Sequence, residues 1–194
     1  MGASRGIGLE FVNQLLSRGC DVVATMRQES SALRELQAKA AGSVVSGSSE
    51  GKLELLTMDV TDQASIRNAF QSLSSRLTAD DANAKKLTHI IFNAGVYPSS
   101  GAGRALGAVD AQQMLDAYAV NTIGPLLVIQ EFLPLLTSPV AKDVTGAGKE
   151  NKKMGMLTRL PVYAILTSKV GSVDDNSGGG SYAYRSSKVR FRLC

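Results

Sequence analysis

The sequence predicts an α/β fold, a doubly wound parallel sheet with helices on both faces. Short apolar or β-branched runs alternate with segments of helical periodicity along almost the whole chain of 194 residues. This alternation is typical of parallel strands covered by helices. Glycine-rich or polar turns follow several of the runs, as expected for loops between such elements. With 44% apolar and 20% charged residues, the composition indicates one ordinary globular domain spanning residues 1–194.

The first expected elements are a helix at residues 6–18 and a strand at residues 21–25. In the helix, apolar side chains recur at helical spacing on one face, and Gly19 follows as a stop signal. The strand is the short β-branched run "DVVAT". A second helix is expected at residues 30–40, "SSALRELQAKA", because its opening serines can cap a helix.

A strand at residues 52–58 and a helix at residues 61–77 come next. The run "KLELLTM" has the length and apolar content of a strand, and Thr61 or Asp62 can cap the helix behind it. The polar insert before this strand, residues 42–51, has no periodicity and is expected to form a surface loop.

The last expected strands, residues 88–95 and 161–168, flank a long helical segment at residues 110–136. Both strands are apolar runs that end in a turn. The helical segment should break near Gly124-Pro125, because proline cannot continue the hydrogen bonds of a helix.

Charge and cysteine content argue against several function classes. The net charge is +4, and the densest basic run, residues 148–159, has no aromatic residue for stacking on bases, so we expect a solvated loop and no nucleic-acid partner. Cys20 and Cys194 are too few for a disulfide framework or a metal cluster. Gln130 and Glu131 interrupt the longest apolar stretch, and no signal peptide is recognised. We therefore expect a cytoplasmic protein that has no metal site and does not enter a membrane.

Ligands of such sheets bind at the carboxyl ends of the strands. The first turn of interest is "MGASRGIG", in which Gly2, Gly6 and Gly8 lead directly into a helix. Glycines at this place let a phosphate approach the backbone amides at the helix N-terminus. They would also fit a plain turn, because glycine triplets are a weak signal by themselves.

The second turn of interest follows the strand at residues 21–25 and carries Arg27. An acid near this point binds the ribose 2′-hydroxyl of NAD, whereas an arginine suits the 2′-phosphate of NADP. Arg27, together with Arg5 in the glycine loop, therefore favours NADP(H). The nearby Glu29 leaves NAD open, and both arginines would also fit solvent-facing positions.

Two further strand ends carry polar or small residues. Asp59 can accept from the adenine amino group while the Val60 amide donates to the ring, or Asp59 can help to cap the next helix. Asn93-Ala94-Gly95 ends the next strand along the chain, and such small residues would let a cofactor sugar pass close by.

Tyr184 and Lys188 lie four positions apart in "SYAYRSSKVR", a segment with helical spacing. Residues at this separation share a helix face, so the Lys188 ammonium can lie near the Tyr184 hydroxyl. A nearby positive charge favours the phenolate form and makes tyrosine a competent general acid and base. The same spacing also occurs by chance as a surface pair on many helices.

Taken together, these motifs resemble the short-chain dehydrogenase/reductase family. The matching residues follow the family's order: Gly2-Ala3-Ser4-Arg5-Gly6-Ile7-Gly8, Asp59-Val60, Asn93-Ala94-Gly95, Asn121, Ser168 and Tyr184-x-x-x-Lys188. The glycine-rich insertion before Tyr184 further resembles the sniffer and C-factor branch. The resemblance implies a Rossmann-type fold and an NADP(H)-dependent oxidoreductase for a small carbonyl or secondary-alcohol substrate. It also implies assembly as a homodimer or homotetramer.

The resemblance assigns roles to the site residues. Tyr184 would protonate the substrate oxygen, Ser168 would hydrogen-bond that oxygen, and Lys188 would also bind the nicotinamide ribose. Asn121 would hold a water that links Lys188 to solvent. Ser172 is the alternative to Ser168, because strand ends are uncertain by a few residues. The candidate cofactor-binding residues are Gly2, Ser4, Arg5, Gly6, Ile7, Gly8, Arg27, Asp59, Val60, Asn93, Ala94, Gly95, Tyr184 and Lys188.

The chain also departs from the family pattern. Met1 stands where the family has the threonine that closes its first strand, and the sequence stops before the last two strands and the substrate loop. In the strand order expected for the family, 3-2-1-4-5-6-7, the missing first strand would lie between residues 21–25 and 88–95. We therefore expect a sheet without its first and last strands, in a fragment of a longer protein. A second hypothesis follows, a catalytically inactive remnant that binds nucleotide weakly or needs a partner to fold.

Overall fold

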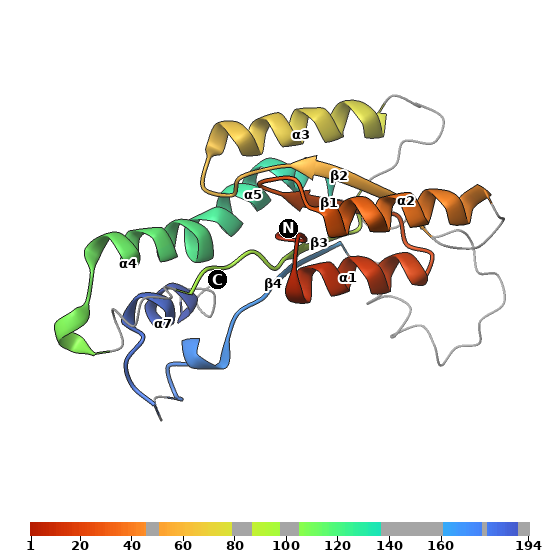
Figure 1. Ribbon diagram of the computed structural model, residues 1–194. Helices are drawn as coiled ribbons and strands as arrows, with labels where there is room; N and C mark the ends of the chain where they lie inside the picture. The colour runs from red at the N-terminus through yellow and green to blue at the C-terminus, as the bar shows by residue number, and fades with distance from the viewer. Residues whose placement is uncertain (46–50, 79–86, 98–104, 137–160, 176–177, 190–194) are drawn as a thin grey trace, which may run out of the picture.

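The structure, a computed structural model, describes residues 1–45, 51–78, 87–97, 105–136, 161–175 and 178–189 (Figure 1). The helices are α1 (Gly6–Ser17), α2 (Ser31–Val45), α3 (Gln63–Thr78), α4 (Ala111–Tyr118), α5 (Gly124–Phe132) and α7 (Tyr182–Val189). The strands are β1 (Val22–Met26), β2 (Leu53–Thr57), β3 (His89–Phe92) and β4 (Val162–Ile165). Short turns of other helix types are η2 (Leu106–Ala108), η3 (Ala119–Ile123), η4 (Leu133–Leu135) and η6 (Lys169–Gly171). Among these described residues, no helix has both the length and the apolar sequence needed to cross a membrane.

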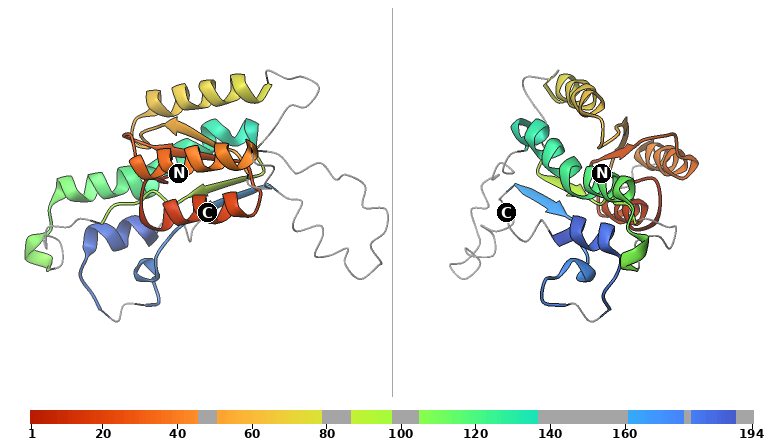
Figure 2. Two further views of the ribbon diagram at one scale, coloured as in Figure 1. Left: turned by 45° about the vertical axis from the view of Figure 1, so that its right-hand side comes forward. Right: turned by 90° about the vertical axis from the view of Figure 1, so that its left-hand side faces the viewer.

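The four strands form two parallel pairs. β1 pairs with β2, with Val22 opposite Leu53, and β3 pairs with β4, with His89 opposite Val162. Helices lie on both faces of the strands (Figure 2). α1 and α2 share one apolar core with β1, whereas α3 and α5 share a second core with β2 and β3. The predicted doubly wound α/β fold is confirmed, because apolar helix faces pack on both sides of parallel strands.

The gap between β1 and β3 is where the sequence predicts a missing strand. Among the described residues, the backbone hydrogen bonds that cross this gap come from the first residues of the chain. The Met1 amino group donates to the Ile91 carbonyl (2.7 Å), and the Asn93 N–H donates to the Met1 carbonyl (3.1 Å). On the other side, the Ala3 N–H donates to the Thr25 carbonyl (3.1 Å). One extended segment thus bonds to both strands, which places β1 and β3 two strand spacings apart, about 10 Å.

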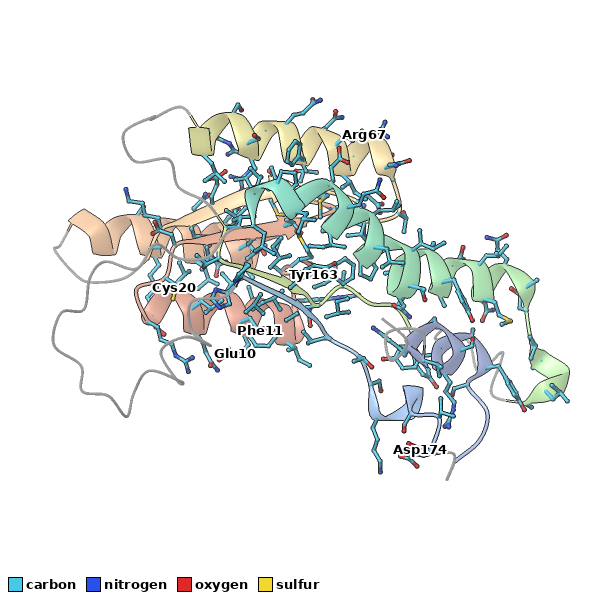
Figure 3. All side chains as sticks on the ribbon, turned by 180° about the vertical axis from the view of Figure 1, so that it is seen from behind. Glu10, Phe11, Cys20, Arg67, Tyr163 and Asp174 are labelled. Carbon is cyan, nitrogen blue, oxygen red and sulfur yellow. The ribbon has the colours of Figure 1, made fainter. Side chains whose placement is uncertain are left out.

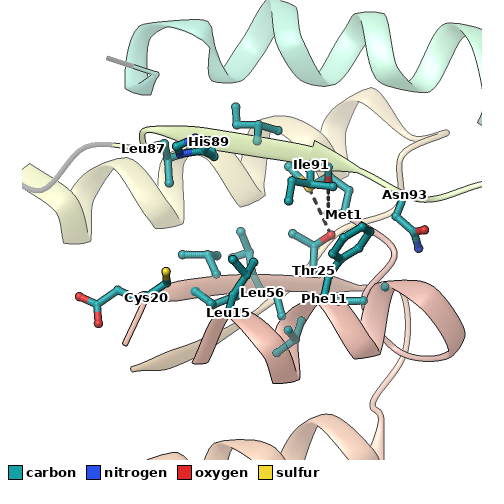
Figure 4. A pocket seen from close by; sticks show the side chains of 18 of the residues that line it. Met1, Phe11, Leu15, Cys20, Thr25, Leu56, Leu87, His89, Ile91 and Asn93 are labelled. Carbon is teal, nitrogen blue, oxygen red and sulfur yellow. Dashed lines mark hydrogen bonds between the residues drawn. The ribbon is translucent and has the colours of Figure 1, made fainter. Parts of the chain in front are cut away.

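The gap contains a cavity of about 360 Å³, which Met1 and Ala3 help to line (Figure 4). Apolar side chains of α1, including Phe11 and Leu15, line one side, and Leu73 and Phe132 line it from the other helix layer. Val22 bonds to the segment before β2, so the alternation of a parallel ladder turns the backbone of Val23 towards the cavity. Apart from these bonds of Met1 and Ala3, the described residues place no strand between β1 and β3, so the predicted absence of a full strand there is confirmed for this part of the chain.

The second core fixes α5 against α3 and β4. The rings of Phe70 and Phe132 make an edge-to-face contact with centroids 5.8 Å apart, a favoured geometry for aromatic pairs. Tyr163 on β4 points towards α5 (Figure 3), and its hydroxyl donates to the Pro125 carbonyl. Burial raises the pKa of Tyr163, so the phenol stays a hydrogen-bond donor. These contacts hold in place the helical segment that carries Asn121.

A π-helical turn, η3, joins α4 to α5. The sequence predicts a break near Gly124-Pro125, but the backbone stays helical through Gly124 (φ −51°, ψ −52°). Pro125 lies in the first turn of α5, where its missing N–H costs no helical hydrogen bond. The irregularity therefore falls just before Gly124, as a π turn that carries the fully buried Asn121. Such turns are frequent at functional sites.

Candidate functional site

The glycine loop and the end of β3 are in direct contact. Gly2 has a left-handed backbone (φ +71°), and a Cβ at this position would come within 2.7 Å of the Ala94 backbone. Gly8 packs against the Gly2 carbonyl and the Asn93 side chain, which leaves no room for a Cβ. The Asn93 side-chain amide donates to the Gly2 carbonyl (2.9 Å). The structure therefore brings the predicted Gly2–Gly8 loop next to Asn93-Ala94-Gly95.

The N-terminus of α1 has no side-chain cap. Arg5 is the N-cap residue in an extended conformation, and its side chain makes no capping hydrogen bond. The first backbone amides of a helix have no partner within the helix and favour an anion. Arg5 and Ile7 are exposed, and the Ser4 carbonyl accepts from the Ser30 hydroxyl (3.3 Å), which ties the loop to the segment before α2. The loop has the features of a phosphate site.

Arg27 and Asp59 follow the neighbouring strands β1 and β2. The Asp59 carboxylate accepts from the Thr61 N–H (2.9 Å) and the Thr61 hydroxyl (2.7 Å). Burial opposes ionisation of Asp59, but these bonds and the positive charge of Arg27 outweigh it and lower the pKa of Asp59. Glu29, the acid that leaves NAD open, forms an ion pair with Arg34 of α2.

The turn after β2 also settles how α3 begins. The Asp62 side chain accepts from the Ala64 N–H (2.9 Å), whereas the Asp59 carboxylate bonds to Thr61 and only the Asp59 N–H reaches α3, where it donates to the Ser65 hydroxyl (2.9 Å). The Thr61 hydroxyl donates to Asp59, so of the candidates Thr61, Asp62 and Asp59 it is the Asp62 side chain that caps α3. Val60 is buried, and a Cβ on Gly124 would lie 3.0 Å from its carbonyl oxygen, so α5 packs closely beneath this turn.

Asn121 links three segments of the chain through its side chain. Its Oδ1 accepts from the Val96 N–H, and its Nδ2 donates to the Val96 carbonyl and to the Ser187 hydroxyl oxygen, all at 2.9 Å. The Ser187 hydroxyl in turn donates to the Tyr184 carbonyl (2.7 Å). Asn121 thus ties the loop after β3 and the helix α7 to the π turn.

Lys188 lies beneath Tyr184 and against the ends of β3 and β4. Only 5% of Lys188 is exposed, and its Nζ donates to the Leu166 carbonyl (3.0 Å). The Nζ lies 5.9 Å from the centroid of the Tyr184 ring, within the range of a cation–π contact. A Cβ on Gly95 would lie 3.4 Å from both the Lys188 Nζ and the Asn121 Oδ1. Burial lowers the pKa of Lys188.

Ser168 and its alternative Ser172 lie on either side of η6. This turn packs against α7, since a Cβ on Gly171 would come within 2.8 Å of the Lys188 Cβ. The Ser172 hydroxyl accepts from the Asp175 N–H (3.3 Å) in the turn that follows. Ser168 is half-buried three positions after the end of β4, and its hydroxyl makes no hydrogen bond to another described residue. The geometry brings together Asn121, Tyr184 and Lys188, and places Ser168 in the neighbouring turn.

Three residues of this region are absent from the sequence-based site. The ring of Tyr97 packs on that of Tyr184 with centroids 4.8 Å apart, while Ser187 and Leu166 supply the hydrogen bonds described above. The sequence could have indicated Tyr97, because this aromatic residue stands two positions after Asn93-Ala94-Gly95, near a strand end where ligands bind. Ser187 and Leu166 gave none, since Leu166 acts through its backbone and Ser187 through a contact between distant segments.

Comparison with protein families matches residues 1–147 to the short chain dehydrogenase family. Among curated proteins, 1-hydroxy-2-glutathionyl-2-methyl-3-butene dehydrogenase of Rhodococcus sp. (strain AD45) is 30% identical over 189 residues, which are 97% of this chain and 63% of that protein. C-signal of Myxococcus xanthus is 36% identical over 104 residues, 54% of this chain and 49% of that protein. The chain thus spans about half to two thirds of the length of these two relatives.

Solved structures show the same fold. The NADPH-bound carbonyl reductase from chicken fatty liver matches with a TM-score of 0.71 and 30% identity, over 99% of this chain and 68% of that one. Carbonyl reductase Sniffer of D. melanogaster matches with a TM-score of 0.72 and 24% identity, over 99% of this chain and 69% of that one.

Proposed function

The chain belongs to the short-chain dehydrogenase/reductase family, in its carbonyl-reductase-like branch, and on this premise we propose that it transfers a hydride between NADP(H) and a carbonyl or secondary-alcohol substrate. The observation that carries the proposal is that Lys188 lies beside the Tyr184 ring, and that Gly95, next to the glycine loop, lies against both Lys188 and Asn121. A phenol, a buried amine and a phosphate-binding loop at one edge of a sheet together suit nicotinamide-dependent chemistry.

The residues at the ends of β1 and β2 fit the adenosine half of NADP(H). The uncapped start of α1 supports binding of the pyrophosphate, and the exposed Arg27 suits the 2′-phosphate. Because Glu29 pairs with Arg34, the case for NAD is weaker. The carbonyl reductase from chicken fatty liver, 30% identical to this chain, binds NADPH. When bound, the nicotinamide supplies a hydride to the carbonyl carbon of the substrate, or accepts one from the alcohol.

The chain's own residues handle the proton. In the reduction direction, the Tyr184 hydroxyl donates its proton to the substrate oxygen, and the Ser168 hydroxyl donates a hydrogen bond to the same oxygen. Lys188, held by the Leu166 carbonyl, keeps a positive charge beneath the Tyr184 ring and offers its remaining protons to the ribose. Asn121 keeps α7 and the loop after β3 in place, and one lone pair of its Oδ1 remains for a water.

The test measures NADPH oxidation in the presence of a panel of aldehydes and ketones, and the loss of NADPH absorbance reports the rate. Tyr184→Phe and Lys188→Ala should each lower kcat/KM by roughly 10²- to 10⁴-fold, the range that a positioned acid or base contributes. Tyr182→Phe is the matched control, since Tyr182 is an exposed tyrosine on the same helix and should keep its activity. Activity that survives both site substitutions would reject the mechanism.

The gap between the two sheets favours a second candidate function, a nucleotide-binding chain without turnover. Within the described residues only Met1 and Ala3 form backbone hydrogen bonds across the space between β1 and β3, and buried backbone groups without partners destabilise a fold by about 1–3 kcal/mol each. A melting experiment separates this candidate from an unfolded chain, because a ligand that binds the native state raises the melting temperature. NADPH that raises the melting temperature without being oxidised by any carbonyl in the panel would support it.

A further inference from the structure

The loop after β3 is fixed along its whole described length against the residues of the proposed reaction. Gly95 lies against the Lys188 Nζ and the Asn121 Oδ1. Both backbone polar groups of Val96 bond to the Asn121 side chain. Tyr97, the next residue, has little freedom to leave the position that this clamp gives it. The backbone of Tyr97 is therefore held next to the residues of the proposed reaction.

Tyr97 lies against the start of α7 through both its ring and its hydroxyl. The ring centroids of Tyr97 and Tyr184 are 4.8 Å apart, with the planes tilted by 59°. The Tyr97 hydroxyl and the Ser181 hydroxyl share a hydrogen bond of 2.7 Å. Ser181 itself has a left-handed backbone (φ +50°) and its carbonyl accepts from the Arg185 N–H, which starts the helix. The contact joins two segments that are far apart in the sequence.

Tyr97 nevertheless keeps 46% of its surface exposed. A carbonyl oxygen that takes a proton from Tyr184 must lie within hydrogen-bond reach of that hydroxyl, about 3 Å. The groups attached to the carbonyl carbon then extend over the few ångströms around Tyr184, where the Tyr97 ring stands. Aromatic rings attract one another at centroid distances of about 4.5–7 Å. An exposed, fixed ring at this place therefore favours substrates that present a ring of their own.

We propose that Tyr97 is a specificity-determining residue, an aromatic wall that gives the site a preference for carbonyl compounds with an aryl substituent over saturated ones of the same size. This inference rests on the proposed function, because it takes Tyr184 as the group that meets the substrate oxygen. The hydrogen bond between the Tyr97 and Ser181 hydroxyls holds the ring in place.

The test compares acetophenone with cyclohexyl methyl ketone, which have the same carbon skeleton but differ in aromaticity. The chain, with NADPH, should show a higher kcat/KM for acetophenone. Tyr97→Leu, which removes the ring but keeps apolar bulk, should lower the ratio of the two values by about two- to tenfold, the size of one aromatic contact. Tyr97→Phe keeps the ring and should retain the ratio within about twofold. Tyr182→Leu, a change at an exposed tyrosine of α7, should leave the ratio unaltered.

A ratio that is equal in the native chain and in Tyr97→Leu would overturn the inference. If the native chain oxidises NADPH with neither ketone, the proposed function fails for these substrates, and the inference is then decided by binding. Titration of each ketone into the chain saturated with NADP⁺, followed by ligand-observed NMR, should show tighter binding of acetophenone that is lost in Tyr97→Leu. Equal affinities for the two ketones, or a preference that survives in Tyr97→Leu, would overturn it.

Discussion

Replacement of Asn121 by alanine should destabilise the chain by about 3–5 kcal/mol. The substitution removes three hydrogen bonds at 2.9 Å from a fully buried side chain. Each bond contributes about 1 kcal/mol, and the Val96 N–H and C=O, left without the side chain that now pairs them, add a penalty of about 1 kcal/mol or more. The sum is a large share of the 5–15 kcal/mol that typically stabilises a domain.

Urea unfolding followed by far-ultraviolet circular dichroism measures this loss as a shift in the transition midpoint. Asn121→Asp keeps the volume and the acceptor for the Val96 N–H but cannot donate to the Val96 carbonyl, so it separates lost hydrogen bonds from lost packing. It should also be strongly destabilising. Gln130→Ala, on the exposed surface of α5, should change stability by less than about 0.5 kcal/mol. A loss below about 1 kcal/mol for Asn121→Ala would refute the view that this side chain holds α7 and the loop after β3 together.

Two further predictions concern the cofactor and the packing of α7. Arg27→Asp should raise KM for NADPH by roughly ten- to a hundredfold, the effect of losing one charge-assisted hydrogen bond. KM for NADH should change far less. Initial-rate measurements that give equal changes in KM for the two cofactors would contradict the assignment of Arg27 to the 2′-phosphate. Gly171→Ala places a Cβ 2.8 Å from the Lys188 Cβ and should lower the free energy of unfolding by about 1–3 kcal/mol. Gly178→Ala, with open space around it, should leave the stability unchanged. Equal melting temperatures for the two variants would contradict the close packing of η6 on α7.

The helices and strands were largely predictable because each carries its own periodicity or end signal. α1 begins at the expected Gly6, and Arg18 and Gly19 lie directly after its last turn. The π turn at Ala119–Ile123 was not predictable in this way, since the local sequence drew attention to Gly124-Pro125. Its position follows from the buried contacts of Asn121 with distant residues, which no local pattern reports.

The site was predictable to the extent that its chemistry follows a fixed spacing along the chain. The four-residue separation of Tyr184 and Lys188 placed both on α7, where they are in contact. Tyr97 reaches the same point from a segment more than eighty residues earlier in the sequence. Its position just after a strand end marks Tyr97 as a candidate, but only the packing of the loop after β3 on α7 shows that it touches Tyr184. The roles of these residues in a reaction stay predictions until the variants are measured.

Because the strands form two separate pairs, binding of a cofactor can affect how the two pairs are aligned. The residues proposed for the adenosine half follow β1 and β2, and those proposed for the reacting half follow β3 and β4. A dinucleotide that contacts both strand pairs would stabilise their alignment across the gap between β1 and β3. By linkage, any change that stabilises this alignment would also raise the affinity for the dinucleotide.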